Sequence, residues 1–262
     1  MAFNIGDVII DRAQFGYGAT RAGVPLYVLT QLSNFSIDIT ADSTDVNDAR
    51  GNLVYRKYTG KKGEVTATNA FLNFAVISAI SGVDPEIATG DHKIKMPILT
   101  TVKAGEKLDI TGFVADSITV SGLANGALGT NYTKAASTEA SATEFAISEN
   151  NLIPPTAAGE KEYFVKYVKE VESGVKVSIT GNKFPKAHEL FVKALAVDPC
   201  DKESFRACVV HIASFMPSPE VTVALEGGDS QTMDYKGSIL TDTCSTEQLM
   251  VEIYFIDEAE EA

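Results

Sequence analysis

Three aspartates spaced three residues apart form the acidic set in this sequence that most resembles a cation site. They are Asp42, Asp45 and Asp48. A calcium-binding EF-hand loop needs oxygen ligands at alternating positions and a closing glutamate at the end of the loop. This spacing does not supply either, so we expect no metal here. We interpret the segment as a solvated loop, with a charged contact to another chain as the alternative.

A group of basic residues follows these aspartates directly. Tyr55 and Tyr58 lie among them, but a nucleic-acid interface needs aromatics on a basic domain, and the surrounding sequence is acidic. An acidic loop and a basic patch in one chain can meet in a repeated head-to-tail contact, or both can be hydrated. The basic group comprises Arg50, Arg56, Lys57, Lys61 and Lys62.

The remaining reactive residues show no catalytic spacing. The three cysteines lack a C-x-x-C pair, the three histidines are far apart, and Gly16-Tyr17-Gly18 stands without the rest of a dinucleotide motif. We therefore expect small buried or half-buried thiols, no cofactor and no enzymatic activity, although the role of each cysteine stays open. An activity lost on mutating His188 or Cys208 would contradict this. The residues are Cys200, Cys208, Cys244, His92, His188 and His211.

The charge balance restricts the partners of the chain. It has 262 residues, with 22 Lys and Arg against 35 Asp and Glu, for a net charge of −13. This excess of acid argues against a surface that wraps nucleic acid or binds anionic lipid. The sequence contains no apolar run long enough for a membrane helix, and its first residues do not resemble a secretory signal.

Strand patterns dominate the elements that must position these side chains. Alternating or β-rich segments occur at 26–30 and 34–40. Turn-forming residues at 41–48 predict an extended loop, which reaches to about residue 51. Two further strands are expected at 52–58 and 63–68, around a turn at 59–62. Later strands are expected at 161–168, 189–197 and 205–212, with a helix as the alternative near 187–196.

One helix is predicted at 70–81, with Asn69 as its N-cap and Gly82 as its C-terminal stop. Its apolar residues form a stripe wide enough to pack on a sheet. The stripe consists of Phe71, Phe74 and Ile77, with Val76 and Ile80 as further members.

A change in composition indicates an inserted lobe. Residues 102–158 are rich in Thr, Ser, Ala and Gly and contain short alternating runs, and Pro154-Pro155 lies near the end of this region. We predict a small β-rich, Ig-like lobe over 102–158. Residues 1–101 and 159–262 then form a discontinuous β domain.

The order of several segments resembles the bacteriophage major tail proteins, the subunits of tail tubes. The longest match is ITADSTDVNDARGNLVYRKYTGKKGEVTATNAFLNFAVISAISG, residues 39–82. SITVSGLANGALGTNYT at 117–133 and GVKVSITGNKFPKAHELFVKALAVDP at 174–199 are similar to the inserted lobe and a return strand of that family. The closing stretch 217–255 also fits, whereas 198–214 departs from the pattern.

The resemblance implies a mainly β fold, a β-sandwich or barrel-like structure with one packed α-helix and an inserted lobe. It implies a structural virion protein whose hexameric rings stack into a tail tube with other tail proteins, assembled in the host cytoplasm. DNA would pass through the lumen during ejection without specific binding, and an acidic wall would keep it from adhering. Sheet edges that are hazards in a monomer would join neighbouring subunits around the lumen.

Two other classes stay open at this point. A capsid-decorating or head-fibre protein would also use a Ser/Thr/Gly-rich lobe such as 102–158. A carbohydrate-binding module is disfavoured because the chain has no tryptophan to form a broad sugar platform.

Overall fold

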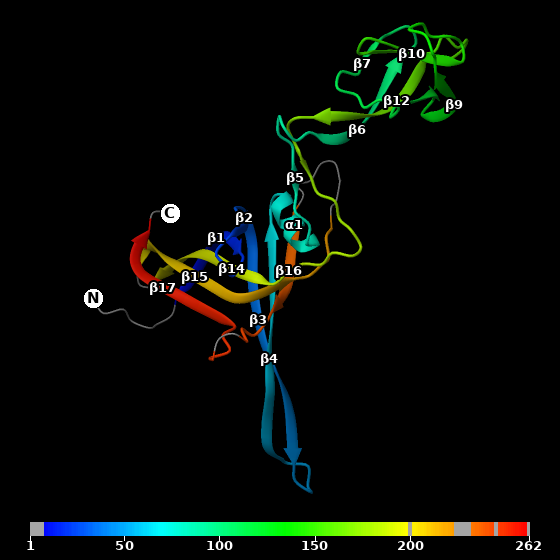
Figure 1. Ribbon diagram of the computed structural model, residues 1–262. Coiled ribbons are helices and arrows are strands. Elements are labelled where there is room, and N and C mark those ends of the chain that lie inside the picture. Colours follow the sequence, from blue (N-terminus) through cyan, green and yellow to red (C-terminus); the bar gives the residue numbers. More distant parts are fainter. Residues whose placement is uncertain (1–7, 199–200, 223–231, 244–245, 261–262) are drawn as a thin grey trace. The chain divides into compact units, whose positions relative to one another are not determined.

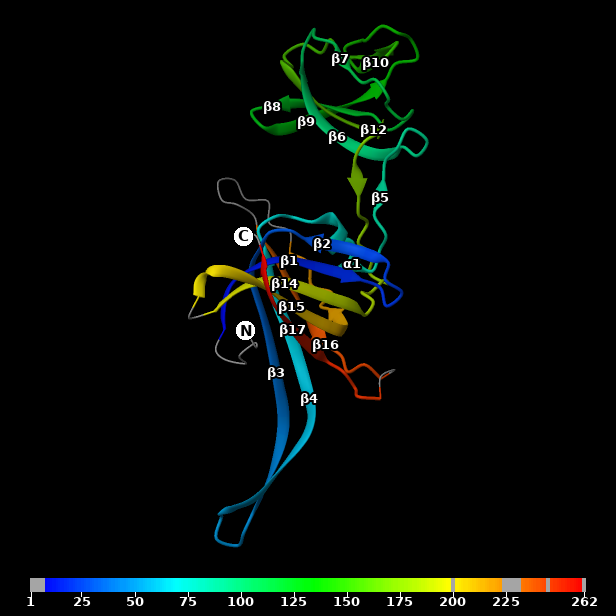
Figure 2. The ribbon, with the colours of Figure 1, turned by 90° about the vertical axis from the view of Figure 1, so that its left-hand side faces the viewer.

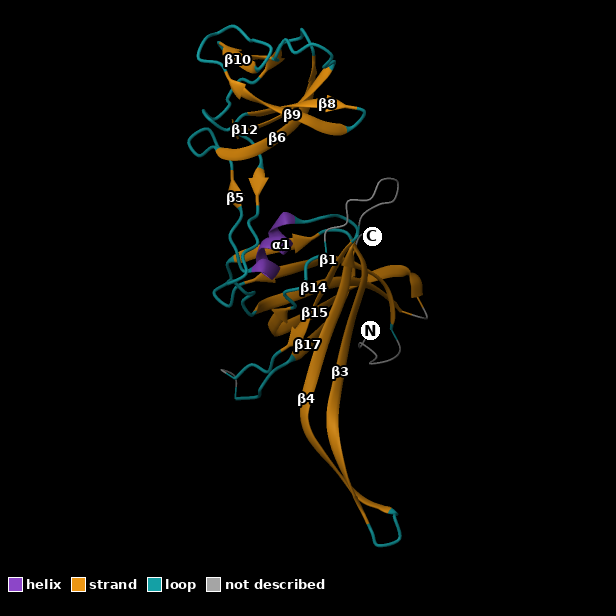
Figure 3. Cartoon of the chain, turned by 90° about the vertical axis from the view of Figure 1, so that its right-hand side faces the viewer, coloured by secondary structure: helices purple, strands orange, loops and turns teal. Residues whose placement is uncertain are grey.

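The computed structural model describes residues 8–260, apart from 199–200, 223–231 and 244–245 (Figure 1). The fold is mainly β, as predicted, and the described residues contain a single α-helix (Figure 3). The chain divides into two compact units. The barrel unit comprises Met1–Pro85 and Val177–Ala262, and the inserted unit comprises Glu86–Lys176.

The barrel unit is built on an eight-stranded antiparallel sheet that curls into a nearly closed, barrel-like form (Figure 2). The strand order is β2-β1-β14-β15-β16-β4-β3, and β17 also pairs with β15. The strands expected at 189–197 and 205–212 are confirmed as β14 and β15. The bounds are β1 (Ile9–Ala19), β2 (Pro25–Leu29), β3 (Leu32–Asn47), β4 (Leu53–Asn69), β14 (His188–Asp198), β15 (Asp201–Pro217), β16 (Met233–Ile239) and β17 (Val251–Glu260).

The core of the barrel unit joins strands that are far apart in sequence. Val65, Leu190, Ile212 and Phe215 have 1% or less of their surface exposed. Burying an aliphatic or aromatic side chain of this size contributes on the order of 1.5–3 kcal/mol. The helix adds Val76, Ile77 and Ile80 to the same cluster, so the sheet and the helix share one core.

The segment expected to be a loop is a long hairpin instead. Residues 41–47 belong to β3, and they pair in register with the first half of β4. The loop prediction failed here because Asp, Asn and Ser usually favour turns, whereas hydrogen bonding to the next strand, β4, determines this conformation. The turn itself spans only Asp48 to Asn52.

The turn expected at 59–62 is also absent, because β4 runs through it without interruption. Gly60 has φ +52°, a conformation that glycine adopts at little cost. At this point the pairing shifts, from Ala41 opposite Lys61 to Asp42 opposite Thr59. The expected turn is thus a β-bulge inside one strand.

Helix α1 (Phe74–Ser81) is shorter than predicted, since its N-cap is Asn73 and not Asn69. The Asn73 side chain accepts the N–H groups of Ala75 and Val76. Asn69 is engaged elsewhere, because its Oδ1 accepts from the N–H of Gln31 and its Nδ2 donates to the carbonyl of Phe71. The predicted end is confirmed, as Gly82 adopts a left-handed conformation and donates to Ser78 O.

The predicted packing stripe of α1 is only partly correct. Ile77 is buried, but Phe74 is 49% exposed. Phe71 is 61% exposed and precedes the helix. The late helix start shifts the buried face to Val76, Ile77 and Ile80.

The inserted unit contains a seven-stranded sheet in the order β6-β12-β8-β9-β10-β11-β7. Its core includes Val120, Phe145, Leu152, Tyr163 and Val165. The bounds are β6 (Ile94–Lys103), β7 (Leu108–Asp109), β8 (Thr119–Ala124), β9 (Ala127–Lys134), β10 (Glu144–Ser148), β11 (Asn151–Ile153) and β12 (Glu162–Val171).

The inserted unit is wider than the lobe expected at 102–158. β6 and β12 pair along ten residues and supply Val102, Tyr163 and Val165 to the same core, so the unit extends over Glu86–Lys176. The chain enters through β5 (Glu86–Ile87) and leaves through β13 (Val175–Lys176), which pair with each other. The two connections therefore lie side by side.

Candidate functional site

The distal part of the β3–β4 hairpin is the most exposed ordered surface of the barrel unit. Every described residue from Asp38 to Lys62 is exposed. Within the described residues, Thr40–Asn47 and Leu53–Lys62 pair only with each other (Figures 1 and 3). A two-stranded ribbon without a covered face is marginally stable in water. The hairpin therefore has the properties of a segment that a partner covers.

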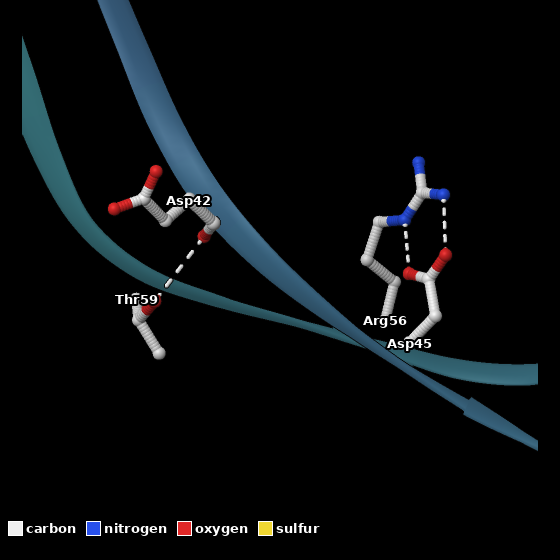
Figure 4. Close-up of polar contacts among 4 residues, drawn as sticks. All are labelled: Asp42, Asp45, Arg56 and Thr59. Atoms are coloured by element: carbon white, nitrogen blue, oxygen red, sulfur yellow. Dashed lines mark hydrogen bonds and ion pairs between the residues drawn. The ribbon is translucent and has the colours of Figure 1, made fainter.

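The acidic and basic residues identified from the sequence pair across this hairpin. Asp45 accepts two hydrogen bonds from Arg56, at 2.6 Å from Nε and 2.9 Å from Nη2 (Figure 4). This contact holds the pKa of Asp45 below its ordinary value. Asp42 pairs with Lys62 at 2.7 Å, and its backbone carbonyl accepts from the Thr59 hydroxyl at 3.4 Å (Figure 4). Two of the three aspartates are thus neutralised by bases of the same hairpin.

Asp48 shapes the turn of the hairpin. One carboxylate oxygen accepts the N–H groups of Arg50 and Asn52, both at 2.8 Å, and the other accepts from the Asn52 side chain at 3.0 Å. These hydrogen bonds favour the ionised form and lower the pKa of Asp48. Gly51 follows with φ +85°. Asp48 therefore acts as a turn residue.

The pairing leaves an excess of positive charge on the hairpin. Arg50, Lys57 and Lys61 make no ion pair with any residue in the described part of the chain. Residues 40–62 contain five bases and three acids, whereas the rest of the barrel unit contains eight bases and 20 acids. The hairpin and the rest of its unit thus have opposite net charge.

Large apolar side chains accompany these charges. Between 51% and 67% of the surface of each is exposed, on both faces of the ribbon. Exposed apolar groups gathered in one segment are typical of a protein interface. They are Val46, Leu53, Val54, Tyr55 and Tyr58.

A buried polar cluster lies in the barrel core, and no sequence pattern indicates it beyond the isolated His188. The Tyr27 hydroxyl lies 2.6 Å from His188 Nε2, and it also bonds to the Tyr235 hydroxyl. His188 Nδ1 donates to the carbonyl of Lys186 at 3.0 Å, so Nε2 is the acceptor. Burial lowers the pKa of His188. A neutral, fully bonded histidine of this kind stabilises a core.

The other candidates that the structure describes include a buried thiol and a histidine paired with a glutamate. No group of three potential ligands occurs among the described residues. Cys208 is a buried free thiol whose pKa is raised by desolvation, while Cys200 and Cys244 lie outside the described residues. His211 Nδ1 lies 2.9 Å from Glu252, which also accepts from Tyr254 at 2.7 Å.

Two hollows border the barrel core. One, of about 480 Å³, is lined by α1, β2 and residues near His188. The other, of about 410 Å³, lies between β1 and β3 over β14 and β15. The second is lined mainly by apolar side chains, whereas the lining of the first also includes Ser78, Asp84, Lys186 and His188.

The comparisons with known proteins agree with this structural picture. In the described part of the chain, no helix is long and apolar enough to cross a membrane. No curated protein matches the chain. The model of the YomU/Tube protein family matches residues 8–253, which cover the inserted unit and most of the barrel unit. This match confirms the predicted resemblance to phage tail tube subunits. The chain therefore belongs to the YomU/Tube protein family, a family of phage tail tube proteins.

Proposed function

We propose that this protein is a non-catalytic subunit that self-assembles into stacked rings, which form the tube of a phage tail. Membership of a tail tube family supports a structural role in the virion tail. The observation that carries the assembly proposal is the exposed β3–β4 hairpin, whose distal half has no covered face in the described part of a single chain. A neighbouring ring covers this hairpin. Six subunits per ring is the number that the resemblance implies.

The barrel-like sheet forms the wall of the conduit. Outside residues 40–62, the barrel unit has 20 acids against eight bases, and a wall of that sign repels the phosphate backbone. DNA then slides through during ejection without adhering. β2, β3 and the proximal part of β4 line or flank this wall, and subunits assemble in the host cytoplasm together with other tail proteins.

The inserted unit decorates the outside of the tube. Its entry and exit strands, β5 and β13, are adjacent, so an insertion of this kind leaves the barrel strands continuous. An independent core lets the unit vary without changing the wall.

Locating the protein on intact particles tests the proposed role. Antibodies against the inserted unit should label the tail along its length. Labelling of the capsid alone would contradict the tube and favour a capsid-decorating protein, which is the alternative that an independent β-rich unit supports.

A further inference from the structure

Two of the strand edges that have no partner in the described part of the barrel unit lie on β4 and β17. The distal part of β4, Leu53–Lys62, pairs with β3 on one side only. β17, Val251–Glu260, pairs with β15 on one side only. Both segments are ten residues long. Unpaired backbone groups along such an edge are a template for another strand.

The two edges have complementary charge. Leu53–Lys62 contains four bases and no acid, and Val251–Glu260 contains four acids and no base. Arg56 and Lys62 are paired within their own hairpin, but Lys57 and Lys61 have no ion-pair partner among the described residues. Opposite potentials across an interface favour one partner and one register over others.

The other free edges fit β17 less well. β3 contains three acids and no base, so it would place like charges opposite the acids of β17. β2 contains no charged residue, so charge does not favour its pairing with β17. The distal β4 edge is therefore the best match to β17 within the described part of the barrel unit.

Exposed apolar side chains lie on both edges. Tyr58 is 67% exposed and Tyr55 61% exposed on β4, while Ile253 is 69% exposed and Tyr254 48% exposed on β17. Cross-strand pairs of aromatic and β-branched side chains stabilise a sheet. The two edges can thus contribute apolar contacts in addition to backbone hydrogen bonds.

We propose that the distal β4 edge of one copy adds to the β17 edge of a second copy, which continues the sheet from subunit to subunit. This inference rests on the proposed tube and names the surfaces that join its subunits. The contact is heterologous, because each copy offers a different edge to each neighbour, so it propagates instead of ending at a dimer.

Cross-linking between two tagged copies tests this pairing. One copy carries Tyr58→Cys and the other carries Ile253→Cys, and a short bismaleimide is added to the mixed assembly. We expect a mixed dimer well above the yield with two controls, which are wild-type mixed with Ile253→Cys and Leu128→Cys mixed with Ile253→Cys. Leu128 is 64% exposed on the inserted unit, and wild-type measures the background from the native cysteines.

A charge swap is the second test of the edge pairing. Lys57→Glu with Lys61→Glu should raise the concentration needed for tube formation about tenfold or more, because acids then face acids. Adding Asp257→Lys and Glu258→Lys to that chain should restore assembly. The edge pairing would be overturned if tubes formed without the mixed dimer, or if the charge swap did not restore assembly. Either result would leave the proposed tube function intact. Absence of tubes in the wild-type would overturn both.

Discussion

The edge strands of the two units differ in length and in proline content. In the inserted unit, edge strand β6 contains Pro97, which has no N–H to donate, and the lysines Lys95 and Lys103. Its other edge strand, β7, is only two residues long. The barrel unit instead leaves β17 and the distal hairpin long and free of proline. Proline and shortness are usual protections against strand addition, whereas lysines occur on free edges of both units. We therefore expect the barrel unit, and not the inserted unit, to associate through its strand edges.

Shortening the hairpin should weaken tube formation more than any single substitution. Ala41 and Lys61 are direct partners across the hairpin, so an Asn-Gly turn can replace residues 42–60 while keeping the remaining register. We expect a folded monomer and complete loss of tubes in sedimentation, since the free edge and its apolar side chains are gone. A near-normal yield of tubes with this chain would show that the hairpin is not an assembly contact.

Core truncations should show whether the units are stabilised separately. Phe215 in the barrel unit and Phe145 in the inserted unit are both almost fully buried. Either Phe→Ala change should cost about 3–5 kcal/mol in its own unit. Calorimetry should show that Phe145→Ala lowers one transition and preserves assembly, whereas Phe215→Ala lowers the other transition and weakens assembly. A single transition that shifts equally in both variants would refute independent units.

Acidification should affect the barrel unit more than the inserted unit. Burial lowers the pKa of His188 in the folded state, so the unfolded chain binds a proton first as the pH falls below the ordinary histidine value of about 6.5. Stability is therefore complete above that value and declines from there towards the lowered folded pKa. The inserted unit contains only the exposed His92.

His188→Gln is the matched control for this pH dependence. Glutamine can accept the tyrosine hydroxyl but does not titrate. Chemical denaturation from pH 7 to pH 5 should show a loss of barrel stability in the wild-type and a flatter profile in the variant. The same slope in both proteins would assign the effect to other groups.

The smallest effect should come from the cap of α1. Asn73→Ala removes an acceptor for two backbone N–H groups and should cost about 1 kcal/mol. Asn73→Ser, like Asn73→Ala, loses the side-chain N–H that donates to the Val28 carbonyl, but it keeps a capping acceptor and should cost less. The barrel transition in thermal unfolding measures both, and the transition of the inserted unit should not move. Equal losses in the two variants would mean that the cap interaction is not what Asn73 supplies.

The sequence predicted what depends on local composition and missed what depends on which segments contact each other. Gly82 ends α1 as expected, because a left-handed glycine is a local requirement. Residues 41–47 have the composition of a loop, and only their pairing with β4 makes them a strand. The choice between Asn69 and Asn73 as the cap depends on the contacts of Asn69 with Gln31 and Phe71.

The same distinction applies to the candidate site. The charged residues of the hairpin could be named from the sequence. The pairing of Asp45 with Arg56 within one hairpin could not be predicted. Their pairing depends on the register, and a shift by one residue would move each side chain to the other face. The bonded cluster of Tyr27, His188 and Tyr235 joins three distant segments, so no local motif could indicate it.

Electron microscopy of the purified chain at rising concentration, without other tail proteins, tests the central claim most directly. We predict stacked rings that grow into tubes with an open lumen, and no tubes from the chain with the shortened hairpin. Wild-type protein that stays monomeric at every concentration would contradict the account.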